Sequence, residues 1–390
     1  MRTAALLVLA LLGCGRPARS PCGETGFGRL TRITAGKGFT CGLTNTHAVL
    51  CWGSNADHAV GSAKGPGAQR PHRVIDDAVD VAAGWTRACA VRHDGQVLCW
   101  GFEGFDALVD ESLRPGRSSP VPRAVEGLAD ARTISCGGFT CCAVRTNGRV
   151  ACFGDNRFGQ LGDGGKVTRP WAADVANLTH VVQVTATGAR SCGLRSDGTV
   201  WCWGLALDQG LGDGSTIDRA VPGPVPGVKH ATSLGGGAQS ICAVADGEVV
   251  CWGTLPSSGV DEPPRRPGSI GFLASFDPLA VESGATVESP ICVRSAGGEV
   301  ACLGNNLHGQ LGNGTTEGER SLVRVEGLSD VTSIAVGGAH VCALRLDGEL
   351  WCWGSNESGQ LAAPDEQDHT RPTRVFFREA WDKPALSTCL

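Results

Sequence analysis

The sequence lacks the signatures of several common functional classes. It has no H-E-x-x-H pair, no G-x-S-x-G elbow and no glycine-rich phosphate loop, so nothing in it indicates the usual zinc hydrolases, serine hydrolases or nucleotide-binding enzymes. The net charge is −5 with acidic and basic residues mixed, which leaves no basic patch for nucleic acid. Helical patterning is also scarce. What the chain does contain is 57 glycines, 20 prolines and 19 cysteines among 390 residues, which is typical of short strands and tight turns.

The N-terminus carries a short apolar run, from Ala4 to Leu12, after a charged start. The run is too short for an ordinary membrane span and is typical of a secretory signal. The sequence L-L-G-C that ends at Cys14 resembles a bacterial lipoprotein processing site, and Gly15 after it favours the outer membrane. An ordinary signal peptide is the alternative. We expect residues 1–13 to be removed, residues 14–30 to form a short tether, and the protein to be an extracytoplasmic lipoprotein of a bacterial cell envelope, held to the membrane by its lipid alone.

Pairs of cysteines recur around short glycine-containing loops. In "VCALRLDGELWCWG", residues 341–354, the loop 346–348 suits a type I turn closed by a bulge. Counting outward from this loop places Cys342 opposite Cys352 on two antiparallel strands. The same spacing recurs in five other pairs, one of which has His47 in the glycine position.

The remaining pair tests this interpretation, because Cys242 and Cys251 are one residue closer together. A two-residue Asp-Gly loop at 246–247, the favoured type I′ sequence, again leaves the two cysteines opposite each other. The turn differs and the pairing is kept.

Opposed residues on antiparallel strands lie about 4.5–5.5 Å apart at Cα, which a disulfide can span. We therefore predict seven disulfides, and an oxidising compartment. Free buried thiols are the alternative, and zinc is disfavoured because its ligands usually lie in close C-x-x-C or Cys/His clusters. The seven predicted bonds join Cys41 with Cys51, Cys89 with Cys99, Cys142 with Cys152, Cys192 with Cys202, Cys242 with Cys251, Cys292 with Cys302, and Cys342 with Cys352.

Apart from Cys14, four cysteines remain, and four cysteines allow three pairings. We favour Cys136 with Cys141, which are local, and Cys22 with Cys389, which lie at opposite ends of the mature chain. The second pairing requires the two ends of the chain to meet.

The pairs repeat with a period near fifty residues, which indicates a propeller, a solenoid or an array. Each unit contains four strand signals, the number in a propeller blade. The first run of each unit is rich in small residues, as crowding near an axis requires. The last run tends to open with proline, which is tolerated where a sheet edge is free. These prolines are Pro71, Pro120, Pro170 and Pro372.

The units resemble those of the regulator of chromosome condensation repeat family. "GGAHVCALRLDGELWCWGSNESGQL", "CFGDNRFGQLGDG" and "CLGNNLHGQLGNG" carry its G-G-x-H-x-x-A-L, W-G-x-N and G-Q-L-G-x-G elements. The resemblance implies an all-β fold, a seven-bladed β-propeller over residues 31–377, with residues 378–390 as a tail that closes onto the N-terminus. Residues 102–119 and 254–285 lack the G-Q-L-G loop, so we expect long irregular loops there.

The resemblance also suggests a binding face. A secreted bacterial propeller of this family inhibits β-lactamases through the loops that follow its inner strands. The matching positions here, which we expect to contact a partner, are Lys37, Phe39, Trp85, Arg87, Phe139, Arg190, Gln239 and His340. The alternative is that Phe39, Trp85 and Phe139 cap the core under their own loops. By contrast, the tryptophans that follow the second cysteines are expected to pack between blades; these are Trp52, Trp100, Trp203, Trp252 and Trp353.

No catalytic group stands out. The nine histidines are scattered, and His340 is expected to be structural. Asp163 and Asp213 lie in "GDG" loops that lack the ladder of oxygen ligands needed for calcium, so we interpret them as turn formers. We therefore expect a monomeric binding scaffold for a protein or glycan, without catalysis, cofactor or metal. A hydrolase of envelope polymers and an enzyme inhibitor on the same propeller remain the alternatives.

The pairing of the two chain ends is directly testable. Peptide mapping of the mature protein without reduction should recover a cross-linked peptide that joins Cys22 to Cys389. Recovery of both residues as alkylated free thiols would rule this pairing out.

Overall fold

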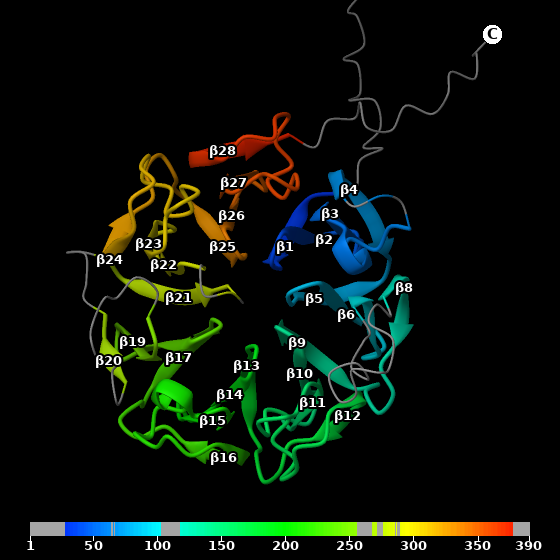
Figure 1. The fold of residues 1–390 in the computed structure, drawn as a ribbon, viewed down its shortest axis with the longest axis vertical. Coiled ribbons are helices and arrows are strands. Elements are labelled where there is room, and N and C mark those ends of the chain that lie inside the picture. The colour runs from blue at the N-terminus through cyan, green and yellow to red at the C-terminus, as the bar shows by residue number, and fades with distance from the viewer. Residues whose placement is uncertain are drawn as a thin grey trace, which may run out of the picture.

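The computed structural model of the protein is a closed ring of seven four-stranded antiparallel sheets (Figure 1). It describes residues 28–376 except 64, 66, 103–117, 256–266, 271–275, 285, 287 and 288. Each sheet is one blade built from four consecutive strands, so the predicted all-β, seven-bladed propeller is confirmed. The expected signal and most of the expected tether and tail lie outside the described residues.

The strands follow chain order. Blade 1 contains β1 (Leu30–Ala35), β2 (Phe39–Thr44), β3 (Val49–Ser54) and β4 (Gly67–Ile75), and blade 2 contains β5 (Ala78–Ala83), β6 (Arg87–Arg92), β7 (Val97–Phe102) and β8 (Ser118–Ala124). Blade 3 contains β9 (Ala131–Gly137), β10 (Thr140–Arg145), β11 (Val150–Gly154) and β12 (Arg169–Asp174), and blade 4 contains β13 (Val181–Ala186), β14 (Arg190–Arg195), β15 (Val200–Gly204) and β16 (Arg219–Pro224). Blade 5 contains β17 (Ala231–Gly236), β18 (Ser240–Ala245), β19 (Glu248–Gly253) and β20 (Gly268–Ser269). Blade 6 contains β21 (Pro278–Ser283), β22 (Ile291–Ser295), β23 (Val300–Gly304) and β24 (Glu319–Arg324), and blade 7 contains β25 (Val331–Val336), β26 (His340–Arg345), β27 (Leu350–Gly354) and β28 (His369–Val375). Two short 3₁₀ turns, η1 (Ala56–His58) and η2 (Leu207–Gln209), lie in the β3–β4 and β15–β16 loops.

The first strand of each blade lies nearest the axis, and the last strand lies at the rim (Figure 1). Small residues on the inner strands permit the crowding there. A Cβ on Gly137 would lie 2.2 Å from the carbonyl oxygen of Ala186 in the next blade, and one on Gly235 would lie 2.4 Å from that of Val281. The prolines lie in the outer strands, whose outer edges need no ladder partner.

The hairpins have the turns that their sequences predict. Gly348 has φ +85°, and the 346–348 loop is closed by a bond from the Arg345 N–H to the Glu349 carbonyl. Asp246 and Gly247 both have positive φ, as a type I′ turn requires. The left-handed conformation falls on His47, with φ 66°, in the hairpin without glycine.

All seven predicted cross-strand cysteine pairs are bonded, and each bond joins the second and third strands of its blade. They are Cys41 to Cys51 in blade 1, Cys89 to Cys99 in blade 2, Cys142 to Cys152 in blade 3, Cys192 to Cys202 in blade 4, Cys242 to Cys251 in blade 5, Cys292 to Cys302 in blade 6, and Cys342 to Cys352 in blade 7. The two members of every pair lie directly opposite each other in the strand register. The pairings made from the sequence are therefore confirmed one by one.

The spacing of these pairs differs from the expected 4.5–5.5 Å, because the Cα–Cα distances are 4.0–4.1 Å. The hairpin of blade 7 shows the reason. Arg345 bonds to Glu349 across the turn, and hydrogen-bonded and non-hydrogen-bonded pairs alternate along an antiparallel ladder. Cys342 and Cys352, three pairs further out, therefore fall at a non-hydrogen-bonded position, which is the closer of the two kinds.

An eighth disulfide joins Cys136 of β9 to Cys141 of β10, as favoured from the sequence. The other three cysteines, Cys14, Cys22 and Cys389, lie outside the described residues. The lipid anchor at Cys14 and the bond between the two chain ends therefore stay predictions.

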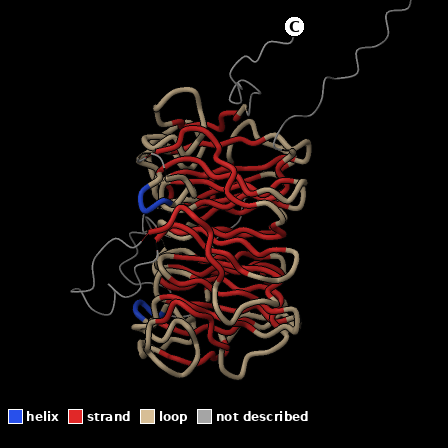
Figure 2. The backbone as a smooth tube through the Cα atoms, turned by 90° about the vertical axis from the view of Figure 1, so that its right-hand side faces the viewer, coloured by secondary structure: helices blue, strands red, loops and turns tan. Residues whose placement is uncertain are grey.

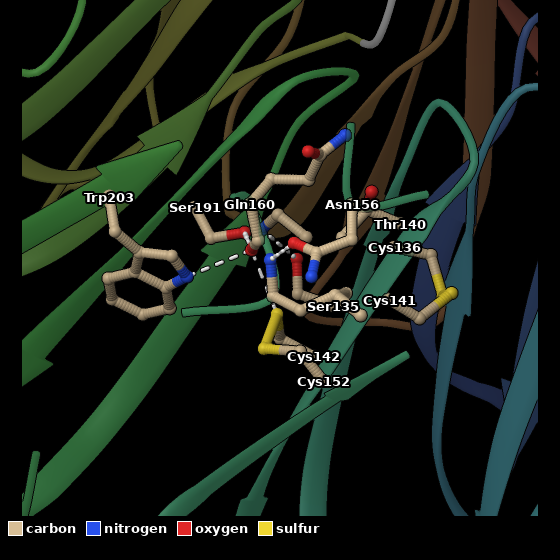
Figure 3. The surroundings of a disulfide bond; sticks show 12 residues. Ser135, Cys136, Thr140, Cys141, Cys142, Cys152, Asn156, Gln160, Ser191 and Trp203 are labelled. Carbon is tan, nitrogen blue, oxygen red and sulfur yellow. Dashed lines mark hydrogen bonds between the residues drawn. A yellow bond between two sulfur atoms is a disulfide. The ribbon is translucent and has the colours of Figure 1, made fainter. Parts of the chain in front are cut away.

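Neighbouring blades are connected by a repeated hydrogen bond. The indole N–H of Trp203 donates to the backbone oxygen of Gln160 in the preceding blade at 2.8 Å (Figure 3). Gln160 belongs to the G-Q-L loop between β11 and β12, and Trp353 and Trp52 bond to Gln310 and Gln360 in the same way. The W-G and G-Q-L elements are therefore the two halves of one contact.

This contact explains two departures from the repeat. Blades 1 and 4 have H-A-V-G (58–61) and Q-G-L-G (209–212) in place of G-Q-L-G, whereas blades 2 and 5 have no related sequence. The blades that follow blades 2 and 5 have Phe153 and Leu303 where the other blades have tryptophan. Phe153 and Leu303 are both buried, and neither side chain has an N–H to donate. The indole donor is therefore missing after the two blades whose sequence has no element related to G-Q-L, and it is kept after blade 1, where Trp100 donates to the Ala59 carbonyl at 3.0 Å. Most residues of the two segments predicted as irregular loops lie outside the described residues.

The ring closes without a strand shared between the first and last blades, because β1 pairs with β2 and β25 with β26 in separate sheets. Leu30, Ile33 and Trp52 of blade 1 share one buried cluster with Leu344 and Leu361 of blade 7. The indole N–H of Trp52 donates across this junction at 3.0 Å. The first and last described strands therefore meet as any two neighbouring blades do.

The indole contact predicts a measurable loss of stability. Trp203→Phe removes the N–H donor and part of a buried ring, and we expect it to lower the free energy of unfolding by about 2–3 kcal/mol. Denaturant titration with the disulfides intact measures this difference. Trp171→Phe, on a side chain that is 48% exposed at the rim, is the matched control and should change it by less than about 0.5 kcal/mol. Equal effects of the two substitutions would show that the bond has no special role.

Candidate functional site

The candidate site lies on one face of the ring. Because the strands of a blade are consecutive and antiparallel, the turns after the first strands and the loops after the third strands meet on the same side. We call this side the loop face; it includes the turns 36–38, 84–86 and 138–139. It also includes the 3₁₀ turns η1 and η2, the two helical segments that lie on one side of the molecule in Figure 2. The Asp-Gly hairpin turns lie on the opposite face.

The structure divides the eight predicted contact residues into two groups. Lys37 and Gln239 are exposed on the loop face, and Trp85 and Phe139 are half-buried there. The other four are buried; they are Phe39, Arg87, Arg190 and His340. The burial of Arg87 and Arg190 differs from the expected exposed rim, whereas that of Phe39 agrees with the alternative that it caps the core.

The buried four share one place in the fold. Each is the first residue of the second strand in its blade, where the side chain points into the junction with a neighbouring blade. In two of these blades the preceding turn places a glycine against the aromatic side chain. A Cβ on Gly36 would lie 2.0 Å from the Phe39 ring, and one on Gly337 would lie 2.2 Å from the His340 ring. The glycine of the G-G-x-H element therefore makes room for the residue three positions later.

His340 illustrates this position. It is fully buried at the start of β26, so the expectation of a structural role agrees with its burial, although it lies in the strand rather than in a loop. The Thr40 hydroxyl donates to the Gln360 carbonyl at 3.0 Å, so its oxygen accepts the N–H from His340 Nε2 at 2.9 Å. This leaves Nδ1 buried without a partner, and burial lowers the pKa of His340 from 6.5 to about 4.

Arg190 is similarly used inside the structure. Its two terminal nitrogens donate to the carbonyls of Gln239 at 2.8 Å and Leu207 at 3.2 Å, so it connects blade 4 to the turn of blade 5. Burial lowers its pKa to about 10, against the opposing effect of the Asp208 and Asp218 charges.

Arg87 occupies the matching position in blade 2. Its guanidinium carbon lies 5.8 Å from the centre of the Phe153 ring in blade 3. Like Arg190, it is buried between blades and is not presented on the loop face. The arginines expected on an exposed rim are therefore structural.

The aromatic residues of blades 2 and 3 form a cluster at the loop face. Trp85 and Phe139 pack edge to face with ring centres 5.2 Å apart, and the Phe102 ring centre lies 4.9 Å from that of Phe139. Trp85 also borders a hollow of about 620 Å³ on this face, together with Lys37 and His308. We call Trp85, Phe102 and Phe139 the aromatic cluster. Phe102 was not predicted, because it is the first residue of the segment expected to be irregular and matches no repeat element.

The axial channel is a second cavity, of about 420 Å³, lined by the inner strands. Inner strands do not pair with one another, and polar side chains satisfy some of their free N–H groups. Asp80 accepts from the Ile134 N–H at 2.9 Å, and Ser135 accepts from the Ala186 N–H at 3.1 Å. The residues that line the channel are small or uncharged apart from Arg32 and Glu282.

The two acidic groups near the channel have raised pKa values. Burial raises the pKa of Glu282 from 4.5 to about 7, although the Arg32 charge opposes this shift. Burial also raises the pKa of Asp80, although Arg32 lies 2.9 Å away and two backbone N–H groups donate to the carboxyl. Glu282 is the one carboxylate among the described lining residues, and the paired acids of a glycosidase are not assembled among them.

Other candidate sites are occupied by structural contacts. Asp163 and Asp213 form ion pairs with Arg169 and Arg219, each six residues later in the chain. Both carboxylates therefore stabilise their own loops, as the turn interpretation implies. Among the residues that the structure places, one group of three metal-ligating side chains comes together, and all three are cysteines in disulfides. No helix in the described part of the chain has the length and hydropathy of a membrane span.

The ring, its repeated blade contacts and its loop face define a repeat propeller, and comparison with known proteins places it. Profiles described as "Regulator of chromosome condensation (RCC1) repeat" match residues 31–58, 78–105, 131–160, 181–206 and 331–360, and a second profile of that description matches 297–344 and 347–381. Together they cover about half of the chain. The protein belongs to the RCC1 repeat family.

Individual relatives are distant. The ultraviolet-B receptor UVR8 of Arabidopsis thaliana is 27% identical over 379 residues, covering 88% of this chain and 69% of the receptor. Human WBSCR16 has a TM-score of 0.73 at 22% identity, covering 85% of this chain and 95% of that one. Prp20p of Saccharomyces cerevisiae has a TM-score of 0.70 at 19% identity, covering 87% and 88%. The two structures show the shared fold.

The buried His340 predicts a pH dependence of stability. Its pKa is lower in the folded protein than in the unfolded chain, so the unfolded chain alone takes up the proton between pH 6.5 and about 4, and stability falls as pH falls through this range. From pH 7 to pH 5 this residue should cost about 2 kcal/mol of unfolding free energy. Denaturant titrations at both pH values should show a smaller loss for His340→Gln than for the wild type.

His72→Gln is the matched control, since His72 is exposed on β4. It should lose as much stability as the wild type over the same pH interval. Identical losses in all three proteins would contradict the assignment of a neutral buried imidazole.

Proposed function

We propose that this protein is an exported binding scaffold whose loop face holds a protein partner at the aromatic cluster. The observation that carries the proposal is the edge-to-face pair of Trp85 and Phe139, half-buried at a turn on each of two adjacent blades. Tryptophan, in a rigid setting and with one side reachable, is typical of the residues that dominate binding energy in interfaces. Blades 2 and 3 hold these turns in place, so little conformational freedom is lost on binding.

The relatives favour a protein partner over a glycan. Prp20p, which has the same fold, is described as binding Gsp1p and histones. The net charge of −5, with acidic and basic residues mixed, leaves no basic patch for nucleic acid, so the partner we propose is a protein. The exposed ammonium of Lys37 and amide of Gln239 on the same face could provide the polar rim around the cluster.

Export is proposed from the disulfides and the N-terminal sequence. Eight disulfides among the described residues would persist in an oxidising compartment and be reduced in a bacterial cytoplasm. The L-L-G-C sequence ending at Cys14 supports a lipid anchor on the cell envelope. We propose that a single ring acts there as the binding unit, without chemistry of its own on the partner.

The test compares one protein with two variants. The mature protein is immobilised and exposed to envelope extract, and the captured proteins are identified by mass spectrometry. Trp85→Ala with Phe139→Ala should lose at least tenfold of any partner held by the cluster, because two interface aromatics are each worth about 1–2 kcal/mol. Trp171→Ala, at the rim, should retain it.

Melting curves of all three proteins show whether the loss reflects unfolding. Capture that is equal for all three would exclude the aromatic cluster as the binding site. Loss of capture in both variants would point to the rim or to non-specific aromatic contact instead.

A further inference from the structure

Two disulfides of different blades touch inside the ring. The Sγ atoms of Cys89 in blade 2 and Cys141 in blade 3 lie 3.8 Å apart, which is van der Waals contact between sulfurs. Cys89 is bonded to Cys99, and Cys141 is bonded to Cys136. Four cysteines therefore form one continuous group at the junction of blades 2 and 3.

This contact follows from the alternation of side chains along β10. Cys141 and Cys142 are consecutive, so they point to opposite faces of the sheet, each toward a different neighbouring blade. Figure 3 shows their two disulfides on either side of the strand. Cys142 is bonded to Cys152 within its blade, and Cys141 is left to meet blade 2.

Two other junctions have a hydroxyl at the position of Cys141, which is the residue before the first hairpin cysteine. Ser191 Oγ lies 3.6 Å from Cys142 Sγ between blades 3 and 4, and Thr40 Oγ1 lies 4.0 Å from Cys342 Sγ between blades 1 and 7. At three junctions, therefore, the hairpin disulfide of one blade contacts the residue that precedes the first hairpin cysteine of a neighbouring blade. The junction of blades 2 and 3 differs in offering it a sulfur.

Access to this group is one-sided. Cys136 is half-buried and lines the axial channel, whereas Cys89, Cys99 and Cys141 are buried. The channel volume of about 420 Å³ admits a small molecule. Of the four cysteines, Cys136 is therefore the one next to the channel, where a thiol from solution would enter.

We propose that the disulfide between Cys136 and Cys141 is a thiol-exchange site that accepts a small monothiol at Cys136 and passes the exchange to the disulfide between Cys89 and Cys99. This activity goes beyond partner binding and does not depend on it. In the first step the thiolate of the monothiol attacks Cys136 Sγ and forms a mixed disulfide there. The electron pair of the broken bond leaves on Cys141.

In the second step the Cys141 thiolate attacks Cys89 Sγ. The bond between Cys89 and Cys99 breaks, a disulfide between Cys89 and Cys141 forms, and Cys99 leaves as a thiolate that takes a proton. One monothiol is consumed, and the number of disulfide bonds is conserved when the mixed disulfide is counted. The products are a modified Cys136, a covalent link between blades 2 and 3, and one free thiol at Cys99.

The exchange would act at the aromatic cluster. The disulfide between Cys136 and Cys141 closes the turn that carries Phe139, and Trp85 lies on the turn of the other blade. Opening this disulfide releases the first turn, while the new link ties the two blades together beneath it. A small thiol would therefore alter the surface that we assign to partner binding.

The test uses the intact wild-type protein and reduced glutathione as the monothiol. After incubation at increasing glutathione concentration, the protein is alkylated and mapped without reduction. We expect glutathione on Cys136, a cross-linked peptide that joins Cys89 to Cys141, and alkylated Cys99, at concentrations that leave the disulfide between Cys142 and Cys152 closed. That disulfide is the internal control, because a serine hydroxyl contacts it instead of a sulfur.

Cys136→Ser provides a second test without any added thiol. It leaves Cys141 as a thiol beside Cys89, and we expect the link between Cys89 and Cys141, with a free Cys99, to form in a large share of the folded protein. Two results would overturn the proposal. One is alkylated Cys141 with the Cys89 to Cys99 bond intact in either experiment, and the other is opening of the Cys136 to Cys141 bond no earlier than that of the control disulfide.

Discussion

A blade of this propeller cannot bury its own two faces, so every sheet depends on a neighbour at each side. At five junctions a tryptophan beyond the second hairpin cysteine packs against the preceding blade, and at four of them its indole N–H reaches a backbone oxygen there. The packing at each junction, with the indole bond where it forms, holds one blade against the next. Repeated around the axis, this packing brings blade 7 to blade 1, and the ring closes without a shared strand.

The same dependence decides which residues are available for function. The first residue of each second strand lies in a junction, so a charged side chain there is used to connect blades. Arg190 bonds to two carbonyls, and His340 is held neutral by burial. The turns that precede these residues extend past the junction to the loop face. Binding groups on this scaffold are therefore expected at turn residues such as Lys37, Trp85 and Phe139, one or two positions before the strand begins.

The disulfides act at a smaller scale than the junctions. Seven of them hold the register of single hairpins, and they would do so in any arrangement of the blades. The eighth, between Cys136 and Cys141, joins the channel strand to the second strand and touches the hairpin disulfide of another blade. Through this contact, a covalent bond within blade 3 packs directly against a covalent bond within blade 2. The contact lies below the aromatic cluster.

The sequence by itself determined the hairpins, the seven cross-strand cysteine pairs and the period, because each depends on residues within about ten positions of one another or on their regular recurrence. It favoured the local Cys136 to Cys141 bond among three possible pairings, and the structure decided it. Phe153 and Leu303 replace tryptophan one repeat after the two blades with no sequence related to G-Q-L, and this is also visible in the sequence. Only the structure shows that the tryptophan and the loop touch. The burial of Phe39, Arg87, Arg190 and His340 and the contact of Cys141 with Cys89 were decided by the tertiary structure alone. Both depend on how far adjacent sheets are rotated about the axis, and that rotation comes from packing among residues that lie about one repeat or more apart in the chain.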